Sequence, residues 1–315
     1  MKKKILITTY HSAYLTHAGG EFESLICAEA FKQEGYTVDF YGPYSQDLNN
    51  YQVVFHYTIN HTGIDLLEKI KKLKKQIFLW PNLWLIKADQ ISGDIFKRHI
   101  NCADFVVFKS NAEINNLLQH FEIPSNKIIL IKNGVDELFL NKIPHNIFSN
   151  LYGINNFALT IGIIEPIKNQ HITIRIANEL NIPLVIVGKF RDKSYYDYCK
   201  KIASKNVFFI ESLIYKSDLF RSALQSCRFF IEPSDEPAGL FALTAGISKA
   251  KLVVADNEWG RELFGKHAFY INMKDSIETM CDKIINYEKN SFPFPENFFN
   301  DYIIPLNFNG ILNKL

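Results

Sequence analysis

Short, continuous apolar runs, each followed by a turn and a helical pattern, recur along most of this 315-residue chain. Such runs predict strands of a parallel sheet that is covered on both faces, because a half-exposed strand would alternate polar and apolar residues. Ile231–Lys249 shows the unit most clearly: a strand end, a turn that contains prolines, and a helix with Leu240, Leu243 and Ile247 on one face. The repeated unit predicts an α/β fold.

Two series of these units predict two domains, and the chain is long enough for two domains of roughly 150 residues. The first series fills residues 1–139 and the second fills residues 140–290. We interpret Phe139–Ser149 as a linker, and we expect the Pro- and Phe-rich tail, residues 291–315, to cross back onto the first domain. Both halves are predicted to be Rossmann-like domains that face a cleft.

The composition excludes several other classes. With 47% hydrophobic and 22% charged residues the chain is of ordinary globular type, and its net charge of +2 does not indicate a nucleic-acid partner. No apolar run is long enough to cross a bilayer or to form the core of a signal peptide, so we expect a cytoplasmic protein. The five cysteines are far apart and lack a C-x-x-C pair, which argues against a metal site and against disulfides: Cys27, Cys102, Cys199, Cys227 and Cys281.

The turn after Ile231 places a carboxylate beside a candidate anion site. Glu236 precedes Ala238 and Gly239, which lead into the helix that starts near Leu240. Free N–H groups and the helix dipole attract anions there, and a glycine allows close approach of a ligand. Phosphate and hydroxyl groups together suggest a nucleotide sugar. The alternative is an ordinary helix cap.

Two other strand-end loops of the second half carry cations. Gly162–Lys168 (GIIEPIK) places Lys168 just before a helix, and the next loop offers Lys189 and Arg191. Such cations suit a diphosphate. Lys168 alone could equally be a solvated residue at a helix start. Because strand ends converge at one edge of a parallel sheet, we predict that the three loops form one site.

The first half offers candidates at the corresponding edge of its own sheet. Gly19 and Gly20 stand at a helix entry, where paired glycines suit close approach to a phosphate or sugar, although a flexible turn is the alternative. The G-x-G-x-x-G motif of dinucleotide-binding proteins is absent from the sequence. The side chains expected on the acceptor side are His11, His17, His56 and Asn82.

Lysines crowd the end of one predicted helix. Cations at a helix C-terminus complement the dipole and cover a solvated face. The alternative is a basic patch for an anionic membrane surface, which would make the protein peripheral at the inner face of the membrane. The five residues are Lys69, Lys71, Lys72, Lys74 and Lys75.

Motifs in order along the chain resemble those of the retaining, nucleotide-sugar-dependent glycosyltransferases of the GT-B fold, the family that includes bacterial capsule and lipopolysaccharide transferases. The resemblance implies an acceptor domain followed by a donor domain, and a reaction without a metal ion or other cofactor. The matching segments are Ala18–Glu21, Asp104–Ser110, Asn133–Asp136, Gly162–Asn169 and Pro233–Ala245.

The resemblance also implies residue roles. Lys168 would hold the donor diphosphate and Glu236 would contact the hydroxyls of the transferred sugar, which makes these two the predicted catalytic residues. The residues predicted to bind the donor are Gly19, Gly20, Lys168, Lys189, Arg191, Glu236, Ala238, Gly239, Leu240 and Thr244.

The chain departs from the family pattern at three places. Ile163 replaces an arginine of the diphosphate site, Thr244 replaces a second glutamate, and Phe78–Asn82 lacks a histidine often found there. We predict a metal-independent glycosyltransferase that moves a sugar from a nucleoside diphosphate to a glycan or lipid-linked acceptor in cell-surface polysaccharide synthesis. The alternative is a degenerate, non-catalytic protein that binds a glycan or a partner enzyme.

Overall fold

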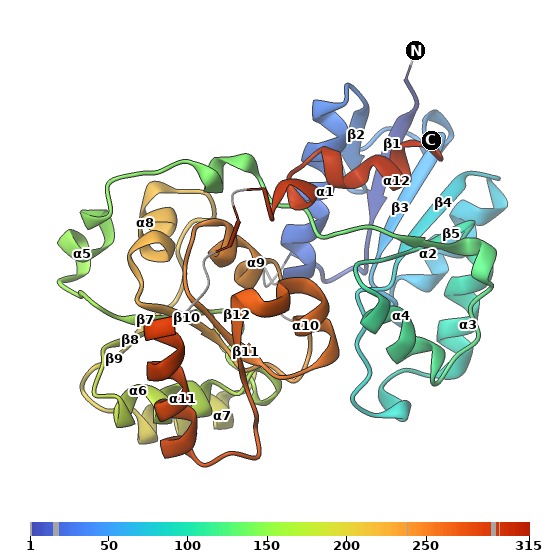
Figure 1. Ribbon diagram of the computed structural model, residues 1–315. Helices are drawn as coiled ribbons and strands as arrows, with labels where there is room; N and C mark the ends of the chain where they lie inside the picture. Colours follow the sequence, from blue (N-terminus) through green and yellow to red (C-terminus); the bar gives the residue numbers. More distant parts are fainter. Residues whose placement is uncertain (1, 15–18, 238, 291–293, 296) are drawn as a thin grey trace. The chain divides into compact units, whose positions relative to one another are not determined.

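The computed structural model describes residues 2–14, 19–237, 239–290, 294–295 and 297–315 (Figure 1). The chain divides into two compact units, Met1–Asp136 with Asn300–Leu315, and Glu137–Phe299. In the described chain each unit is built on one parallel sheet of six strands. This architecture confirms the predicted α/β class with two Rossmann-like domains.

The sheet of the first unit has the order β2-β1-β3-β4-β5-β6. Its apolar runs are buried on both faces, and β3 is buried along its whole length. Phe55 on β3 stacks on Phe78 of β4 with ring centroids 4.7 Å apart. The strands are β1 (Lys4–Thr8), β2 (Thr37–Phe40), β3 (Val53–Tyr57), β4 (Gln76–Trp80), β5 (Phe105–Phe108) and β6 (Ile128–Leu130).

Amphipathic helices cover this sheet. In α2 the buried residues Ile64, Leu67 and Ile70 recur at the spacing of one helix face. One helix, α3, is missing from the sequence-based prediction, since its buried face includes His99 and Cys102 beside its larger apolar residues. The helices of this unit are α1 (Gly19–Gln33), α2 (Ile64–Lys72), α3 (Gly93–Cys102), α4 (Asn111–Leu118) and α12 (Asn309–Leu312).

The sheet of the second unit has the order β9-β8-β7-β10-β11-β12. Numbered within the unit, this is the order 3-2-1-4-5-6 of doubly wound dinucleotide-binding folds. The order reverses between β7 and β10, and ligands of such folds bind outside the carboxyl ends of the strands at that point. The strands are β7 (Ala158–Ile161), β8 (Leu184–Val187), β9 (Val207–Ile210), β10 (Phe229–Glu232), β11 (Leu252–Ala255) and β12 (Ala268–Ile271).

Helices α6, α7 and α11 belong to the second unit (Figure 1). They contribute to one core, where Ile174, Cys199 and Met280 pack with strand residues. The predicted linker is wrong in part, because its second half begins α5, whose Phe148 is fully buried. The helices are α5 (Asn146–Tyr152), α6 (Gln170–Glu179), α7 (Lys193–Ile202), α8 (Asp218–Ser226), α9 (Leu240–Ile247), α10 (Glu258–Phe264) and α11 (Ile277–Asn290).

The end of the chain, Asn300–Leu315, belongs to the first unit. The backbone N–H of Val135 donates to the carbonyl of Tyr302 at 2.8 Å, and that of Ile304 donates to the carbonyl of Val135 at 3.1 Å. A side chain at Gly134 would collide with Ile304 and Asn307. The glycine of the Asn133–Asp136 motif therefore allows the chain end to pack closely on this segment.

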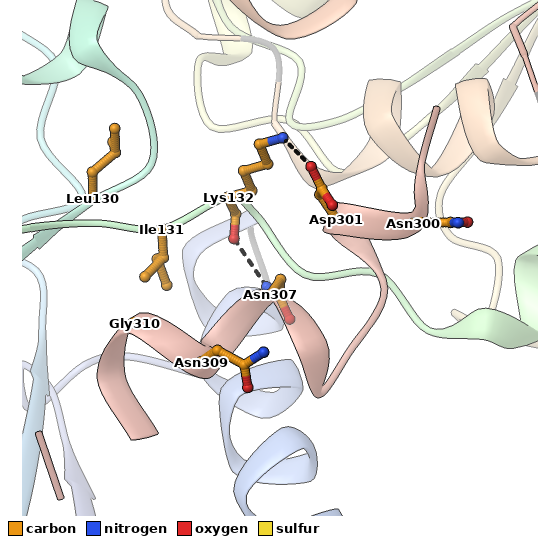
Figure 2. A pocket seen from close by; sticks show the side chains of 8 residues that line it. All are labelled: Leu130, Ile131, Lys132, Asn300, Asp301, Asn307, Asn309 and Gly310. Atoms are coloured by element: carbon orange, nitrogen blue, oxygen red, sulfur yellow. Dashed lines mark hydrogen bonds and ion pairs between the residues drawn. The ribbon is translucent and has the colours of Figure 1, made fainter. Parts of the chain in front are cut away.

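The same region carries a surface pocket of about 450 Å³ (Figure 2). Two contacts join polar groups of its lining: Lys132 Nζ lies 2.7 Å from Asp301, and Asn307 Nδ2 donates to the carbonyl of Lys132 at 2.9 Å. The pocket is a junction between β6 and the chain end. Its lining residues are Leu130, Ile131, Lys132, Asn300, Asp301, Asn307, Asn309 and Gly310.

Candidate active site at the carboxyl edge of the second sheet

The loops after β7 and β10 meet at the point where the strand order of the second unit reverses. The backbone N–H of Asp235 donates to the carbonyl of Ile167 at 2.9 Å. Asn169 Nδ2, which is buried, donates to the carbonyl of Pro233 at 2.9 Å. These bonds hold a short 3₁₀ helix, Pro166–Lys168, against the turn that carries Glu236.

The loop after β8 joins this pair. Ile164 donates its backbone N–H to Lys189 at 2.9 Å, and Arg191 donates its own to Ile164 at 3.2 Å. Gly162 and Gly188 have φ of +153° and +156°, and a side chain at Gly188 would collide with the backbone of Gly162. Only glycine fits this approach, which brings the predicted loops together in one unit.

Lys168 lies between two carboxylates. Its Nζ is 2.7 Å from Glu236 Oε1 and 3.5 Å from Glu232 Oε1, and 17% of its side chain is exposed. Burial alone would lower the pKa of Lys168, but the negative charges of Glu232, Glu236 and Glu165 raise it above its usual value. The lysine is therefore charged throughout the neutral pH range.

Glu232 is the last residue of β10, and it is buried. Its Oε2 accepts no hydrogen bond from a described residue. Burial, helped by the charge of Glu236, raises the pKa of Glu232 to about 7 against the lowering effect of Lys168. The backbone N–H of Gly239 also lowers this pKa. This carboxyl group therefore keeps its proton to a higher pH than an exposed glutamate does.

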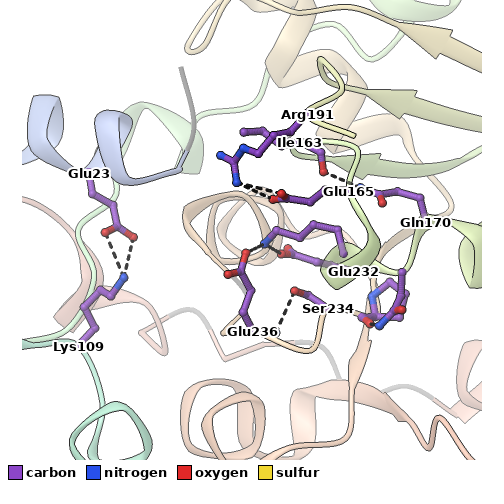
Figure 3. A network of polar contacts seen from close by, with 12 residues as sticks. Glu23, Lys109, Ile163, Glu165, Gln170, Arg191, Glu232, Ser234 and Glu236 are labelled. Atoms are coloured by element: carbon purple, nitrogen blue, oxygen red, sulfur yellow. Dashed lines mark hydrogen bonds and ion pairs between the residues drawn. The ribbon is translucent and has the colours of Figure 1, made fainter. Parts of the chain in front are cut away.

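A second ion pair borders the first (Figure 3). Arg191 Nη1 lies 2.9 Å and 3.1 Å from the two carboxylate oxygens of Glu165. The arginine side chain is 58% exposed, whereas that of Glu165 is 14% exposed. Burial raises the pKa of Glu165, and Arg191 opposes the shift. A guanidinium group therefore reaches the site from the loop after β8.

The turn before α9 is shaped by a serine side chain and ends at Gly239. Ser234 is buried and its Oγ accepts the backbone N–H of Glu236 at 3.3 Å, which shapes the turn. Gly239 has an extended backbone at the start of α9, and no side chain caps that end among the described residues. A Cβ at Gly239 would meet no described atom within 4 Å, so the backbone is open to close approach by a ligand. Leu240 is buried, and Ala238 lies outside the described residues.

The structure does not bring all predicted donor-binding residues to the surface. Thr244 is fully buried, and its Oγ1 donates to the carbonyl of Leu240 in its own helix at 2.6 Å. This position argues against the expected contact with a donor. A threonine hydroxyl in a helix can donate to the carbonyl four residues earlier, so the hydroxyl of Thr244 needs no partner outside α9. Lys189 is exposed and lies 3.5 Å from Glu211.

Among the residues predicted in the first unit, the structure brings Gly20 and Asn82 together. Gly20 lies against Asn82, because a side chain at Gly20 would collide with the amide of Asn82. Gly19 is the first residue of α1, and His11 lies in an exposed turn. His17 lies outside the described residues.

His56 corrects the expected acceptor side. β3 runs to Tyr57, so His56 lies within the strand and is fully buried, with Nδ1 2.8 Å from Thr8 Oγ1. Burial lowers the pKa of His56 to about 3, which leaves the imidazole neutral. It is a core residue.

Sequence reasoning overlooked buried carboxylates that pair with cations in both units. Glu232 has a local signal, since it closes the apolar run of β10 where an uncharged residue is expected. Glu23, on α1 of the first unit, is also buried and lies 3.1 Å from Lys109 Nζ, and Asn133 Nδ2 donates to it at 3.2 Å (Figure 3). Its partners are distant in the sequence, so no local pattern could have identified this network.

No three His, Cys, Asp or Glu side chains in the described ranges gather as metal ligands would. None of the helices in the described part of the chain combines the length and apolarity needed to span a bilayer. Within the lysine cluster, Lys71 pairs with Asp104 at 2.8 Å and Lys75 donates to the carbonyl of Asn49 at 3.0 Å. The other three, Lys69, Lys72 and Lys74, are exposed.

Comparison with known proteins identifies the fold. No protein-family model matches the chain, and no curated protein matches its sequence. Among solved structures, Anabaena Alr3699/HepE in complex with UDP-glucose superposes with a TM-score of 0.78 at 15% identity, over 100% of both chains. Sucrose-phosphate synthase from Thermosynechococcus elongatus gives 0.74 at 12% identity, over 92% of this chain and 90% of the other. A glycosyltransferase from Rickettsia africae gives 0.74 at 14% identity, over 100% and 98%. The two Rossmann-like units are thus those of the GT-B fold.

Proposed function

We propose that this protein is a glycosyltransferase that moves a sugar from a nucleoside diphosphate to a glycan or lipid-linked acceptor. The observation that carries the proposal is the placement of Lys168 and Glu236 within 2.7 Å of each other at the strand-order reversal of the second unit. A cation for the diphosphate and a carboxylate for sugar hydroxyls are the two groups that a sugar donor requires at one place. Structures of the same fold that hold UDP or UDP-glucose support this proposal.

In the proposed reaction the bond between the anomeric carbon and the diphosphate oxygen breaks, and the diphosphate leaves with the electron pair. The acceptor hydroxyl oxygen forms the new bond with retention of configuration, and its proton passes to the leaving diphosphate. Lys168 and Arg191 stabilise the charge that develops on the leaving group, together with the backbone N–H groups at the start of α9. Glu236 orients the sugar through its hydroxyls. No step of this scheme requires a metal ion.

A cell-surface polysaccharide pathway is the proposed setting, on the resemblance to capsule and lipopolysaccharide transferases. Such acceptors are assembled at the inner face of a membrane, which the three exposed lysines of the α2 region would favour. Sugar transfer does not depend on this membrane contact, so the two can be tested separately.

One observation favours the non-catalytic alternative. Thr244 is buried and offers no group to a nucleotide ribose. The contact with the ribose that the resemblance implies is therefore missing. A protein that binds a glycan or a partner enzyme without transferring sugar would have the same fold.

A donor panel separates the two functions. We expect one of UDP-glucose, GDP-glucose, ADP-glucose and dTDP-glucose to raise the melting temperature, because a ligand present at 100 times its Kd stabilises the native state by about 2.7 kcal/mol. Lys168→Ala should abolish the shift, and Lys283→Ala, an exposed lysine of α11, should leave it unchanged. No shift with any donor would favour the non-catalytic protein.

A further inference from the structure

Glu232 is placed where a donor diphosphate would create a conflict of charge. Its Oε1 lies 3.5 Å from the ammonium group of Lys168, which also contacts Glu236. The proposed donor brings about two further negative charges to the same ammonium. Arg191 is the other cation of the site, and it is already paired with Glu165. With two carboxylates and a diphosphate at Lys168 the site holds excess negative charge, so we expect one of the two carboxylates to move or lose its charge.

The two carboxylates differ in their freedom to move. Glu236 lies on the turn after β10, and 33% of its side chain is exposed, so it can rotate toward the hydroxyls of a bound sugar. Glu232 belongs to the strand itself, in register with Val254 of β11, and is buried. Because burial disfavours the charged form of a carboxylate, protonation is the means by which Glu232 would lose its charge.

Lys168 is the cation that faces Glu232, and it is shared with Glu236. Lys168 approaches from the 3₁₀ helix and Glu236 from the following turn, while the N–H of Gly239 approaches from the start of α9. Val254, its neighbour in the strand register, carries no charge. The second oxygen of Glu232 has no hydrogen-bond partner in the described chain, as suits a carboxyl group that takes up a proton there.

We propose that Glu232 takes up a proton when the donor diphosphate binds to Lys168, so that donor binding and protonation of this residue are coupled. The inference rests on the proposed function, because it needs a diphosphate at Lys168. The proton comes from solvent, the carboxylate becomes a neutral carboxyl group, and no covalent bond of the donor changes. Donor affinity should therefore fall as the pH rises above neutrality, by up to tenfold per pH unit.

Proton uptake can be measured directly. The donor that gives the largest thermal shift in the panel is titrated into the protein by calorimetry at pH 8, in buffers that differ in ionisation enthalpy. A nucleoside diphosphate sugar is the suitable probe, since its diphosphate is esterified at both ends and does not itself titrate near neutral pH. We expect uptake to approach one proton per donor at pH 8 and to fall toward zero at pH 5.5, where Glu232 is already protonated.

Two variants test whether Glu232 is the residue that takes up the proton. Glu232→Gln should bind the donor without proton uptake and with the same affinity at pH 6 and pH 8. Glu165→Gln, which neutralises the other largely buried carboxylate of the site, should retain the uptake. The reverse pattern, or uptake that persists in Glu232→Gln, overturns the assignment.

The wild-type titration keeps the proposal falsifiable even if Glu232→Gln fails to fold. A donor that binds wild-type protein with no proton uptake between pH 6 and pH 8 overturns the coupling and leaves the proposed function intact. If no donor in the panel binds, the proposed function itself is overturned and the coupling falls with it.

Discussion

The ammonium group of Lys168 lies 2.7 Å from Oε1 of Glu236, across the two loops that flank the strand-order reversal of the second sheet. The residue proposed to hold the donor diphosphate is therefore paired with the residue proposed to hold the sugar. A donor that binds here exchanges this ion pair for two new interactions.

Glu236→Gln should separate donor binding from sugar transfer. The change removes the negative charge that competes for Lys168, so donor affinity should stay the same or increase. Transfer should fall by about 10²–10³-fold, because an amide orients the sugar hydroxyls less strongly as charge develops in the transition state. Initial rates and donor Kd values measure the two effects. Asp235→Asn, an exposed neighbour on the same turn, is the control, and equal rates in the two variants would contradict the role of Glu236.

Arg191→Ala should weaken donor binding by about tenfold. Its guanidinium group lies in the site on the loop after β8 and pairs with Glu165, and the loss of one charged hydrogen-bond donor to a diphosphate has roughly this effect. Titration calorimetry with the same donor gives the Kd. Lys193→Ala removes an exposed cation at the start of α7 and should leave the Kd unchanged. If Arg191→Ala also leaves it unchanged, the diphosphate does not reach this loop.

Thr244→Glu tests whether the position faces a donor. Because Thr244 is fully buried, a glutamate there would place a carboxylate in the core without a partner, at a cost of several kcal/mol of unfolding free energy. We expect urea denaturation to show this loss and donor affinity not to improve. Thr244→Val, which removes only the bond to Leu240, should cost about 1 kcal/mol. A stable Thr244→Glu protein with tighter donor binding would show that the position is accessible.

The free energy of unfolding should depend on pH through the titration of Glu232. Its pKa is raised in the folded protein from 4.5 to about 7, so the folded state binds this proton more tightly than the unfolded state does. The resulting stabilisation is fully present below pH 4.5 and is lost as the pH rises through 7, and it amounts to at most about 3 kcal/mol. Glu232→Gln should therefore gain stability relative to wild type between pH 5 and pH 8.

A second glutamate of the same unit provides the control for that measurement. Arg228 lowers the pKa of Glu288, so the stability that Glu288 contributes is present above its unfolded pKa and is lost only in acid. Urea denaturation at pH 5, 6, 7 and 8 should then show a constant difference between Glu288→Gln and wild type. A Glu232→Gln difference that is equally constant would contradict the raised pKa.

The exposed lysines of the α2 region should govern any contact with an anionic membrane. Each lysine near the headgroups contributes about 1 kcal/mol, so replacing Lys69, Lys72 and Lys74 by glutamine should reduce binding to phosphatidylserine vesicles by about a hundredfold. Sedimentation at low and high salt measures this effect. The same replacement of Lys193, Lys200 and Lys205 in the second unit is the control. Equal sedimentation of all proteins would exclude this surface from membrane contact.

Local sequence patterns were sufficient for the elements that carry the proposed site. The apolar runs of β7, β8 and β10 predicted strands, and the glycines and cations after them marked the loops that come together. The same patterns misjudged His56, because the end of a strand depends on its pairing with a neighbour, and one or two residues decide whether a side chain lies in the core or beyond it. They also missed α3 and the start of α5.

The sequence by itself determined the α/β class, the two sheets, and the presence of Lys168 and Glu236 on strand-end loops, because these depend on periodicity and on residues close together in the chain. Only the tertiary structure decided which charges meet. It placed Glu232 and Glu236 on one ammonium group, paired Arg191 with Glu165, and buried the hydroxyl of Thr244 in its own helix. Burial and charge pairing arise from segments that are distant in sequence, so the electrostatic state of the site is a property of the folded chain.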